Sequence, residues 1–339
     1  MQDTHIKESL KNWWAMVVEY QKPNARKAIG QLLNTFLPFI GLWILMYFSL
    51  DWSYLLTLGL AGIAAFFLVR IFIIQHDCGH QSFLGYRKLN NVIGFISSFF
   101  STIPYNSWSR THAEHHAINA QLEFRGLGDI HFLTTEEYNK RSKWGKLRYR
   151  VFRHPVMLFV IAPIFYRAIS IRIPFLRLKG WRQVRWAHWA NNLLLLLIYG
   201  TLAMVLGWQK FLLVHVPVVV LFGVIAFWFF YVQHQHEENY KEWKDKWDHL
   251  LASVKGSTYY KLPRVFQWLS GNIGYHHIHH LNSRIPNYHL EACAKENPDL
   301  NKYVTVLTFR ESLKCMHYKL WDEKTKRMIT FREYVKERE

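Results

Sequence analysis

The sequence predicts an all-α integral membrane protein with four transmembrane helices arranged as two hairpins, further interfacial helices and a cytoplasmic cap. Three observations lead to this prediction. Half of the 339 residues are apolar, and only 19% are charged. The apolar residues gather in long blocks, and the charged residues gather between those blocks. A chain of this composition, with few glycines and prolines, is neither disordered nor fibrous.

Four apolar stretches account for the predicted transmembrane helices. A helix needs about 20 residues to cross the ~30 Å hydrocarbon core of a bilayer. The stretches that approach or reach this length are residues 32–50, 54–74, 189–206 and 211–233. Only a few residues separate the first stretch from the second, and the third from the fourth. Connections this short produce antiparallel hairpins, and their turns then lie on the same side of the membrane.

The distribution of basic residues orients the hairpins. Of the 42 lysines and arginines, only Lys210 falls in the two turns. The positive-inside rule therefore places the bulk of the protein in the cytoplasm. The net charge of +18 is then explained by a basic face against anionic lipid, so no nucleic-acid partner is expected. Three scattered cysteines are too few for a disulfide framework and indicate a reducing compartment.

The chain is predicted to divide into five consecutive parts. These are an N-terminal interfacial segment, a first hairpin, a cytoplasmic segment, a second hairpin and a C-terminal cytoplasmic segment, at residues 1–31, 32–74, 75–188, 189–233 and 234–339. An amphipathic helix over residues 3–20 is expected to lie along the membrane interface. The apolar runs 92–103 and 155–171 are short for spans, so we expect them to be interfacial or re-entrant.

Three histidine clusters follow the apolar stretches. They are HDCGH with His76 and His80, HAEHH with His112, His115 and His116, and HHIHH with His276, His277, His279 and His280. Residues three or four apart share one face of a helix, so such imidazoles can converge. Eight converging histidines, that is all of these except His277, exceed the four ligands of a zinc site, which favours two metal ions. A set of nitrogen ligands with open positions suits iron better than magnesium or calcium.

These clusters resemble the three histidine boxes of the membrane fatty acid desaturases. The flanking stretches HDCGHQSF, SRTHAEHH, RGLGDI, FYVQHQ and GSTYYKLPRVFQWLSGNIGYHHIHHL are similar to those of bacterial acyl-lipid desaturases of the Bacillus type. The resemblance implies a non-haem di-iron centre with two iron ions. It implies an O₂-dependent reaction that uses two external electrons to insert a cis double bond into a saturated acyl chain. The chains of membrane phospholipids are the implied substrate, and Δ5 is the position that the Bacillus likeness suggests.

Carried over by position, the resemblance implies nine metal ligands. They are His76, His80, His112, His115, His116, His276, His279, His280 and, from the helix before the third box, His234. Asp77 and Glu114 lie inside the boxes without being ligands of the family, and we expect each to accept the far N–H of a ligating imidazole. His277 and His236 lie beside ligands but are expected to face away. At His131 and His236 the chain departs from the family pattern, which affects local packing rather than the ligand set.

Electrons have to arrive from another protein. The sequence contains neither a GxGxxG fingerprint for a flavin or nicotinamide nor the HPGG motif of a fused cytochrome b5. A small acidic ferredoxin or flavodoxin, attracted to the basic cytoplasmic face, is the expected donor. The protein is thus predicted to be a multi-pass protein of the cell membrane with its histidine boxes on the cytoplasmic side.

Two other functions share parts of this pattern. A di-iron membrane hydroxylase of alkyl or carotenoid substrates would use the same boxes and release an alcohol, but the flanking stretches favour the desaturase. A metal transporter or sensor would hold its ligands near the bilayer midplane on broken helices. Every cluster here is predicted at the boundary between membrane and cytosol, which argues against transport.

Overall fold

The computed structural model describes residues 2–126, 129–173 and 181–336. Residues 127 and 128 of the RGLGDI stretch lie outside the described residues. So do residue 1 of the predicted N-terminal segment, residues 174–180 of the predicted cytoplasmic segment and residues 337–339 of the predicted C-terminal segment. The described chain is mostly helical, and four of its helices are long and apolar enough to cross a membrane. The predicted fold class is therefore confirmed.

The four candidate spans extend beyond the apolar stretches that predict them. They are α3 (Ala25–Ser49), α4 (Tyr54–Gly79), α10 (Trp181–Leu206) and α11 (Trp208–His234). The central helix is α4, which packs against α3, α5 (Arg87–Ser101) and α11. Because α4 and α11 continue past their apolar stretches, both helices carry histidines at the same end of the bundle.

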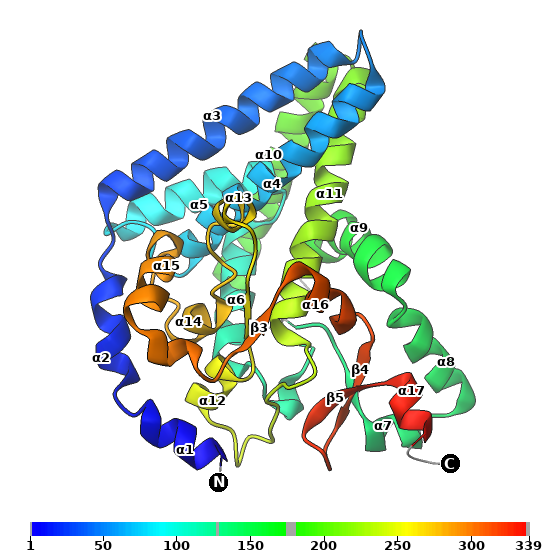
Figure 1. Cartoon of the computed structure of the whole chain (residues 1–339). Coiled ribbons are helices and arrows are strands. Elements are labelled where there is room, and N and C mark those ends of the chain that lie inside the picture. The colour runs from blue at the N-terminus through cyan, green and yellow to red at the C-terminus, as the bar shows by residue number, and fades with distance from the viewer. Residues whose placement is uncertain (1, 127–128, 174–180, 337–339) are drawn as a thin grey trace.

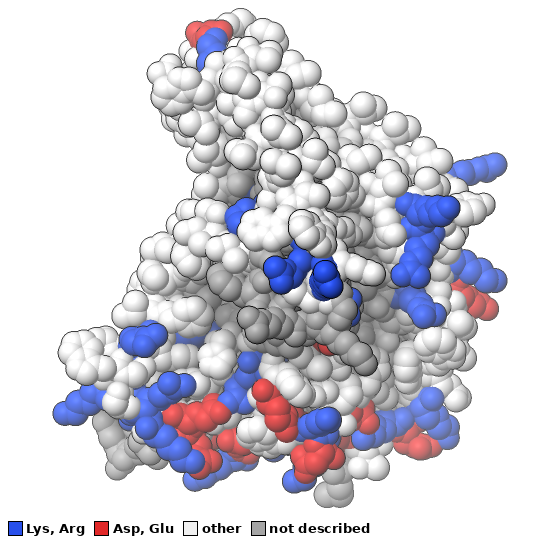
Figure 2. All heavy atoms as spheres, turned by 180° about the vertical axis from the view of Figure 1, so that it is seen from behind, with Lys and Arg blue, Asp and Glu red and all other residues white. Residues whose placement is uncertain are grey.

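The two hairpin turns lie side by side at the other end of the bundle (Figure 1). Lys210 Nζ, in the first turn of α11, donates to Asp51 Oδ1, in the turn between α3 and α4, at 2.7 Å. The second turn is a single residue, Gly207, whose φ of +84° is accessible to glycine and strained for other residues. Figure 2 shows that charged side chains are sparse on the upper part of the molecule and gather over its lower half. Both turns thus lie on one side, as predicted.

The N-terminal segment differs from the single amphipathic helix predicted over residues 3–20. It forms α1 (Gln2–Ser9), α2 (Trp13–Val17) and a 3₁₀ turn, Val18–Gln21, with a break between α1 and α2. Ile6, Leu10 and Val17 are nonetheless almost fully buried in the core. They are four and seven residues apart and would share one face of a straight helix as well, so the apolar periodicity of the segment does not mark the break.

Between the two hairpins the chain forms further helices under the membrane. The first apolar run lies in α5, which is followed by α6 (Tyr105–Ile118). The second run forms a π-helical turn, Met157–Ile161, α9 (Ala162–Ala168) and a 3₁₀ turn, Ser170–Arg172. Together these elements are bent by 58° from α8 (Lys143–Phe152), as in a broken span or a re-entrant loop.

The lower part of the molecule is a cap that combines short helices with two small sheets. Its helices are α7 (Thr135–Lys140), α12 (His249–Val254), α13 (Arg264–Leu269), α14 (His276–Leu281), α15 (Asn287–Glu296), α16 (Phe309–Cys315) and α17 (Phe331–Lys336). In one sheet β4 (Tyr318–Asp322) lies between β1 (Leu133–Thr134), to which it is parallel, and antiparallel β5 (Arg327–Thr330). In the other, β2 (Thr258–Tyr260) pairs in parallel with β3 (Thr305–Leu307). The sheets join the C-terminal segment to the chain around the histidine boxes.

Candidate metal centre

All nine predicted ligands come together where the two central spans end. His76 lies in the last turn of α4, His80 directly follows that helix, and His234 is the last residue of α11. The second box lies on α6 and the third on α14. Helix α14 is buried along its whole length, because Ile278 and Leu281 pack into the core while its histidines other than His277 face α4, α6 and α11.

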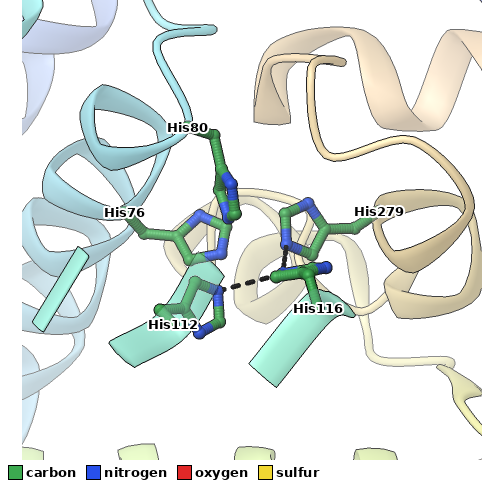
Figure 3. A group of neighbouring side chains, drawn as sticks. All are labelled: His76, His80, His112, His116 and His279. Atoms are coloured by element: carbon green, nitrogen blue, oxygen red, sulfur yellow. Dashed lines mark hydrogen bonds between the residues drawn. The ribbon is translucent and has the colours of Figure 1, made fainter. Parts of the chain in front are cut away.

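The nine imidazoles form two groups, and the first contains five of them. Its members are His76, His80, His112, His116 and His279, which point toward one another in Figure 3. One ring nitrogen from each lies within 4.8 Å of those of the others. Nε2 of His116 is 3.1 Å from Nε2 of His112 and 3.0 Å from Nε2 of His279.

The second group contains the other four imidazoles. Ligand atoms of His115, His234 and His280 lie within 4.8 Å of one another. His276 joins them, because its Nε2 is 2.9 Å from Nε2 of His234 and 3.1 Å from Nε2 of His280. The two groups adjoin: the rings of His116 and His280 are stacked with centroids 4.2 Å apart.

Helix geometry divides the boxes between the two groups. Residues four apart lie on the same side of a turn, so His112 and His116 enter one group together and His276 and His280 enter the other. The remaining histidine of each box is offset around the helix and reaches the opposite group: His115 the second and His279 the first. Both α6 and α14 therefore contribute to both groups.

The spacing of the nitrogens fits metal ligation. Two ligands at right angles on one ion, with metal–nitrogen bonds of about 2.1 Å, lie about 3 Å apart. The Nε2–Nε2 distances within the groups are 2.9–3.2 Å. Nε2 of His234 faces two other Nε2 atoms, from His115 and His276, although a neutral imidazole nitrogen has at most one proton to share. A shared cation satisfies such converging lone pairs, and two iron ions fit the five-and-four arrangement.

Burial also keeps these histidines in the form that binds metals. Burial, followed by the neighbouring imidazoles, lowers the pKa of His112, His116 and His279 well below the ordinary value of 6.5. Burial lowers the pKa of His115 to about 4. These four imidazoles are therefore neutral at pH 7, and the neutral ring offers a lone pair to a cation.

Asp77 lies where the sequence analysis expects it, against a predicted ligand. Its Oδ1 is 2.9 Å from Nδ1 of His76, and both side chains are almost fully buried. Its Oδ2 accepts hydrogen bonds from the backbone N–H and the side-chain Nδ2 of Asn287, at 2.6 and 2.8 Å. An ionised carboxylate only accepts hydrogen bonds, so Nδ1 of His76 carries the proton and Nε2 is free for a metal.

Glu114 does not lie where the sequence analysis expects it. It is half-buried on α6, and no hydrogen bond joins it to an imidazole within the described ranges. Glu114 is one residue from His115 and two residues from His112 and His116. Because successive residues of a helix are turned by about 100°, its side chain points away from those of the ligands. His277 and His236 face away as expected: Nε2 of His277 is 3.1 Å from Oδ1 of Asn301, and His236 is buried outside both groups.

A family model for fatty acid desaturases matches residues 50–310, which include every predicted ligand. The chain belongs to the fatty acid desaturase family. As a member it is an oxidoreductase. It is 43% identical over 332 residues to a fatty acid desaturase of Bacillus subtilis, covering 98% of this chain and 94% of the relative. It is 26% identical over 293 residues to an sn-1 oleoyl-lipid 12-desaturase of a Picosynechococcus species, covering 81% of this chain and 78% of that relative.

A plant relative is more distant. The chain is 26% identical over 247 residues to a chloroplastic sn-2 acyl-lipid omega-3 desaturase of Helianthus annuus, whose name includes ferredoxin. That match covers 69% of this chain and 54% of the relative. The family and the Bacillus likeness expected from the histidine boxes are thus confirmed.

Several residues that support the site of this desaturase were missed by the sequence analysis. Asn287 holds Asp77 across 210 residues of sequence, and Nε2 of Gln31 donates to Asn287 Oδ1 at 2.9 Å. Trp108 stacks on the ring of His112 with centroids 4.6 Å apart. No local spacing pattern identifies such partners, because they come from α3, α15 and the preceding turn of α6.

A buried ion pair beside the second group was also missed. Lys241 Nζ lies 3.9 Å from Asp129 Oδ2, and these two residues and His115 line the same small cavity. Burial lowers the pKa of Lys241, while Asp129 opposes that effect. Asp129 belongs to the stretch RGLGDI, so the family resemblance contained a signal for it.

Proposed function

We propose that this protein is an O₂-dependent desaturase that inserts a cis double bond into saturated acyl chains of membrane phospholipids. The observation that carries the proposal is the pair of adjoining groups of five and four buried imidazoles at the ends of two candidate spans. A site at that place can receive an acyl chain from the bilayer without exposing the chain to water.

We propose that the nine histidines hold two iron ions. When bound, the irons supply the activation of O₂ and the removal of two hydrogens from adjacent carbons. The protein supplies position and exclusion of water. Asp77 fixes the ring and tautomer of His76, and Trp108 covers His112 from the membrane side with Phe72 behind it, at a centroid distance of 4.9 Å.

The proposed orientation puts the histidine end of the molecule in the cytoplasm of a cell-membrane protein. The paired hairpin turns, which contain Lys210 alone of the basic residues, then face the other side. The charged lower half of the molecule is the surface that a ferredoxin or flavodoxin would approach (Figure 2). The name of the Helianthus relative is in line with a ferredoxin donor.

The names of the relatives favour this function over its alternatives. Those of the Picosynechococcus and Helianthus proteins specify acyl lipids as substrates, and all three name a desaturase rather than a hydroxylase. A phospholipid substrate is therefore proposed for this chain, with Δ5 as the position of the new bond. A metal transporter is disfavoured, because the ligands gather at one end of the spans and not along their middle.

The proposal is tested by the fatty-acid profile of a bacterium that lacks an oxygen-dependent desaturase. Cells grown in air would express the wild-type chain, His112→Ala or His317→Ala together with a ferredoxin system. We expect a new monoene with the wild type and with His317→Ala, whose histidine is exposed and remote from both groups, and none with His112→Ala. Derivatisation of the double bond locates it.

Each other outcome has a defined meaning. A hydroxy acid in place of the monoene would assign the chain to the hydroxylases. A monoene formed equally with His112→Ala, or under strict anaerobiosis, would contradict the proposed site and reaction. If the cells form no product although the purified protein contains iron and the ferredoxin system is functional, the proposed substrate is refuted.

A further inference from the structure

A second cavity, of about 430 Å³, lies between α9, α10 and α11, away from the two histidine groups. Most of its lining is apolar, as at Leu195 and Val219. At one end, however, the lining includes the side chains of two arginines, Arg167 and Arg172. Among the described residues that line the cavity there is neither an aspartate nor a glutamate.

Arg167 is buried and only partly satisfied. Its Nη2 donates to Ser101 O at 2.7 Å and to Thr102 Oγ1 at 2.6 Å. Its Nε and Nη1 are buried without a hydrogen-bond partner in the described part of the chain, and 8% of the residue is exposed. The guanidinium lies 4.5 Å from the centre of the Phe222 ring, which offsets part of the cost of burying a cation.

Arg172 is held in place beside it. Its Nε donates to Arg167 O at 3.1 Å, its Nη1 donates to Asn192 Oδ1 at 3.0 Å, and its Nη2 donates to Thr102 O. Two guanidinium groups thus share the end of one apolar cavity without a lining carboxylate. Buried cations are costly unless an anion pairs with them, so this end of the cavity is suited to an anionic group.

The position of the arginines along the spans indicates which anion. Asn192 lies three residues, or about 4.5 Å of helix, past the start of the apolar part of α10. Arg172, which donates to Asn192, is therefore close to the headgroup end of the apolar part of α10, and the apolar lining residues Leu195 and Val219 lie farther from that end of the helices. An anion joined to long apolar chains at this depth is a phospholipid.

A continuous line of aromatic rings connects this cavity with the candidate metal centre. Phe222, under the guanidinium of Arg167, contacts Phe72 with centroids 5.8 Å apart. Phe72 contacts Trp108 at 4.9 Å, and Trp108 stacks on His112 at 4.6 Å. These contacts are between packed rings, and they join the arginine end of the cavity to the first histidine group.

We propose that Arg167 and Arg172 bind the phosphodiester of a membrane phospholipid and thereby set how far its acyl chain reaches past the metal centre. This inference rests on the proposed function and extends it, since it makes Arg167 a positioning residue for the double bond. When the headgroup of the substrate is anchored, the position of the double bond is counted from the carboxyl end of the acyl chain. The anchor therefore defines which carbons lie beside His112.

The binding is tested on purified protein in an uncharged maltoside detergent by native mass spectrometry. The probes are dipalmitoyl phosphatidylglycerol, dipalmitoylglycerol, palmitic acid and inorganic phosphate. We expect the wild type to bind the phospholipid about tenfold more tightly than the diacylglycerol, because charge-assisted hydrogen bonds to the phosphate are added. Equal binding of phospholipid and diacylglycerol overturns the proposal. Tighter binding of palmitic acid makes the ligand a carboxylate, and tighter binding of inorganic phosphate makes it a free anion; either outcome also overturns it.

Three variants separate charge, geometry and space. Arg167→Met removes the charge and is expected to abolish the preference for phospholipid, whereas Arg167→Lys retains part of it. Gly223→Leu leaves the charges in place but fills the cavity, since a Cβ at Gly223 already lies 3.3 Å from Pro163 and 3.6 Å from Arg167. We expect it to weaken binding of both lipids. Iron content and gel-filtration profile show that each variant is folded, and the wild-type comparison of lipids needs no variant.

The same variants in cells distinguish this inference from the proposed function. We expect Arg167→Met to form less monoene and to spread the double bond over neighbouring positions, with unchanged iron content. If the wild type forms the product and Arg167→Met changes neither the lipid preference nor the position of the double bond, only the inference is refuted. Absence of a wild-type product, with phospholipid binding still dependent on Arg167, would refute the proposed function and leave a lipid site.

Discussion

Asp77 orients His76 through a hydrogen bond of 2.9 Å between Oδ1 and Nδ1, inside a region that excludes water from both side chains. Asn287 fixes the other oxygen of the carboxylate with its backbone and side-chain N–H groups. Asn287 is the first residue of α15, which begins a few residues after the third box. Its contact with Asp77 therefore also joins the first box to the segment that follows the third. A role in holding the metal centre follows, and it can be measured.

Replacing Asp77 should weaken metal binding. Both oxygens of Asp77 accept hydrogen bonds, and in Asp77→Asn an NH2 group replaces one of them. That group then faces an N–H of His76 or Asn287, so the ring of His76 loses its orientation. We expect iron affinity to fall by about 10- to 100-fold, measured by competition with a chromophoric chelator. Glu114→Gln is the matched control, because Glu114 has no hydrogen bond to an imidazole in the described structure. An equal loss in both variants would contradict the assignment.

Neighbouring histidines of the third box should differ in their effect on iron content. His279 belongs to the first group, whereas His277 is bonded to Asn301. We expect two irons per chain in the wild type and in His277→Gln, and fewer than one in His279→Ala, determined by elemental analysis of the purified protein. Iron retained in His279→Ala would remove that residue from the proposed ligand set.

Alkaline pH should stabilise the cap through Lys319. Burial, helped by the charge of Arg153, lowers the pKa of Lys319 from 10.5 to about 7. Between these values the unfolded chain binds the proton and the folded chain does not, so the free energy of unfolding rises with pH from about 7 toward 10.5. We expect the apparent Tm at a fixed scan rate to rise over this range and Lys319→Met to reduce the rise, while Lys241, whose pKa burial also lowers, still contributes to it. An unchanged slope in the variant would contradict this account.

Contact between α5 and α6 should be sensitive to the size of residue 94. A Cβ added at Gly94 would lie 2.3 Å from the Tyr105 ring, whose hydroxyl donates to Cys78 O at 2.9 Å. Because Tyr105 begins the helix with the second box, Gly94→Ala should cost about 1–3 kcal/mol of stability and lower the Tm. Gly41→Ala on α3 is the control, since nothing lies within 4 Å of its added Cβ. Similar Tm values for the two variants would refute the packing argument.

The histidine spacing and the apolar stretches were sufficient to predict the spans and the place where the ligands meet, and the stretches that flank the boxes added the family. These signals are local, since a span or an HxxHH box is complete within one segment of sequence. The division of the second and third boxes between the two groups was not predicted. It depends on how α6 and α14 are turned relative to α4 and α11, and that rotation is set by packing of residues such as Ile278.

Other features depend on contacts between distant segments or on short elements. Asn287 and Asp77 are 210 residues apart, and Arg167 faces a cavity formed by three helices. The strands of the cap contain only two to five residues, too few to show a clear alternation of polar and apolar positions. The break after α1 was missed because the buried residues on either side of it keep the spacing of one helical face.

Helices α6 and α14 each supply ligands to both histidine groups. An ion bound in one group therefore orders the helices that the other group also needs, and the second ion meets ligands that are already in position. If the two groups hold the proposed irons, we expect positively cooperative loading, in which chains with no iron or with two outnumber chains with one.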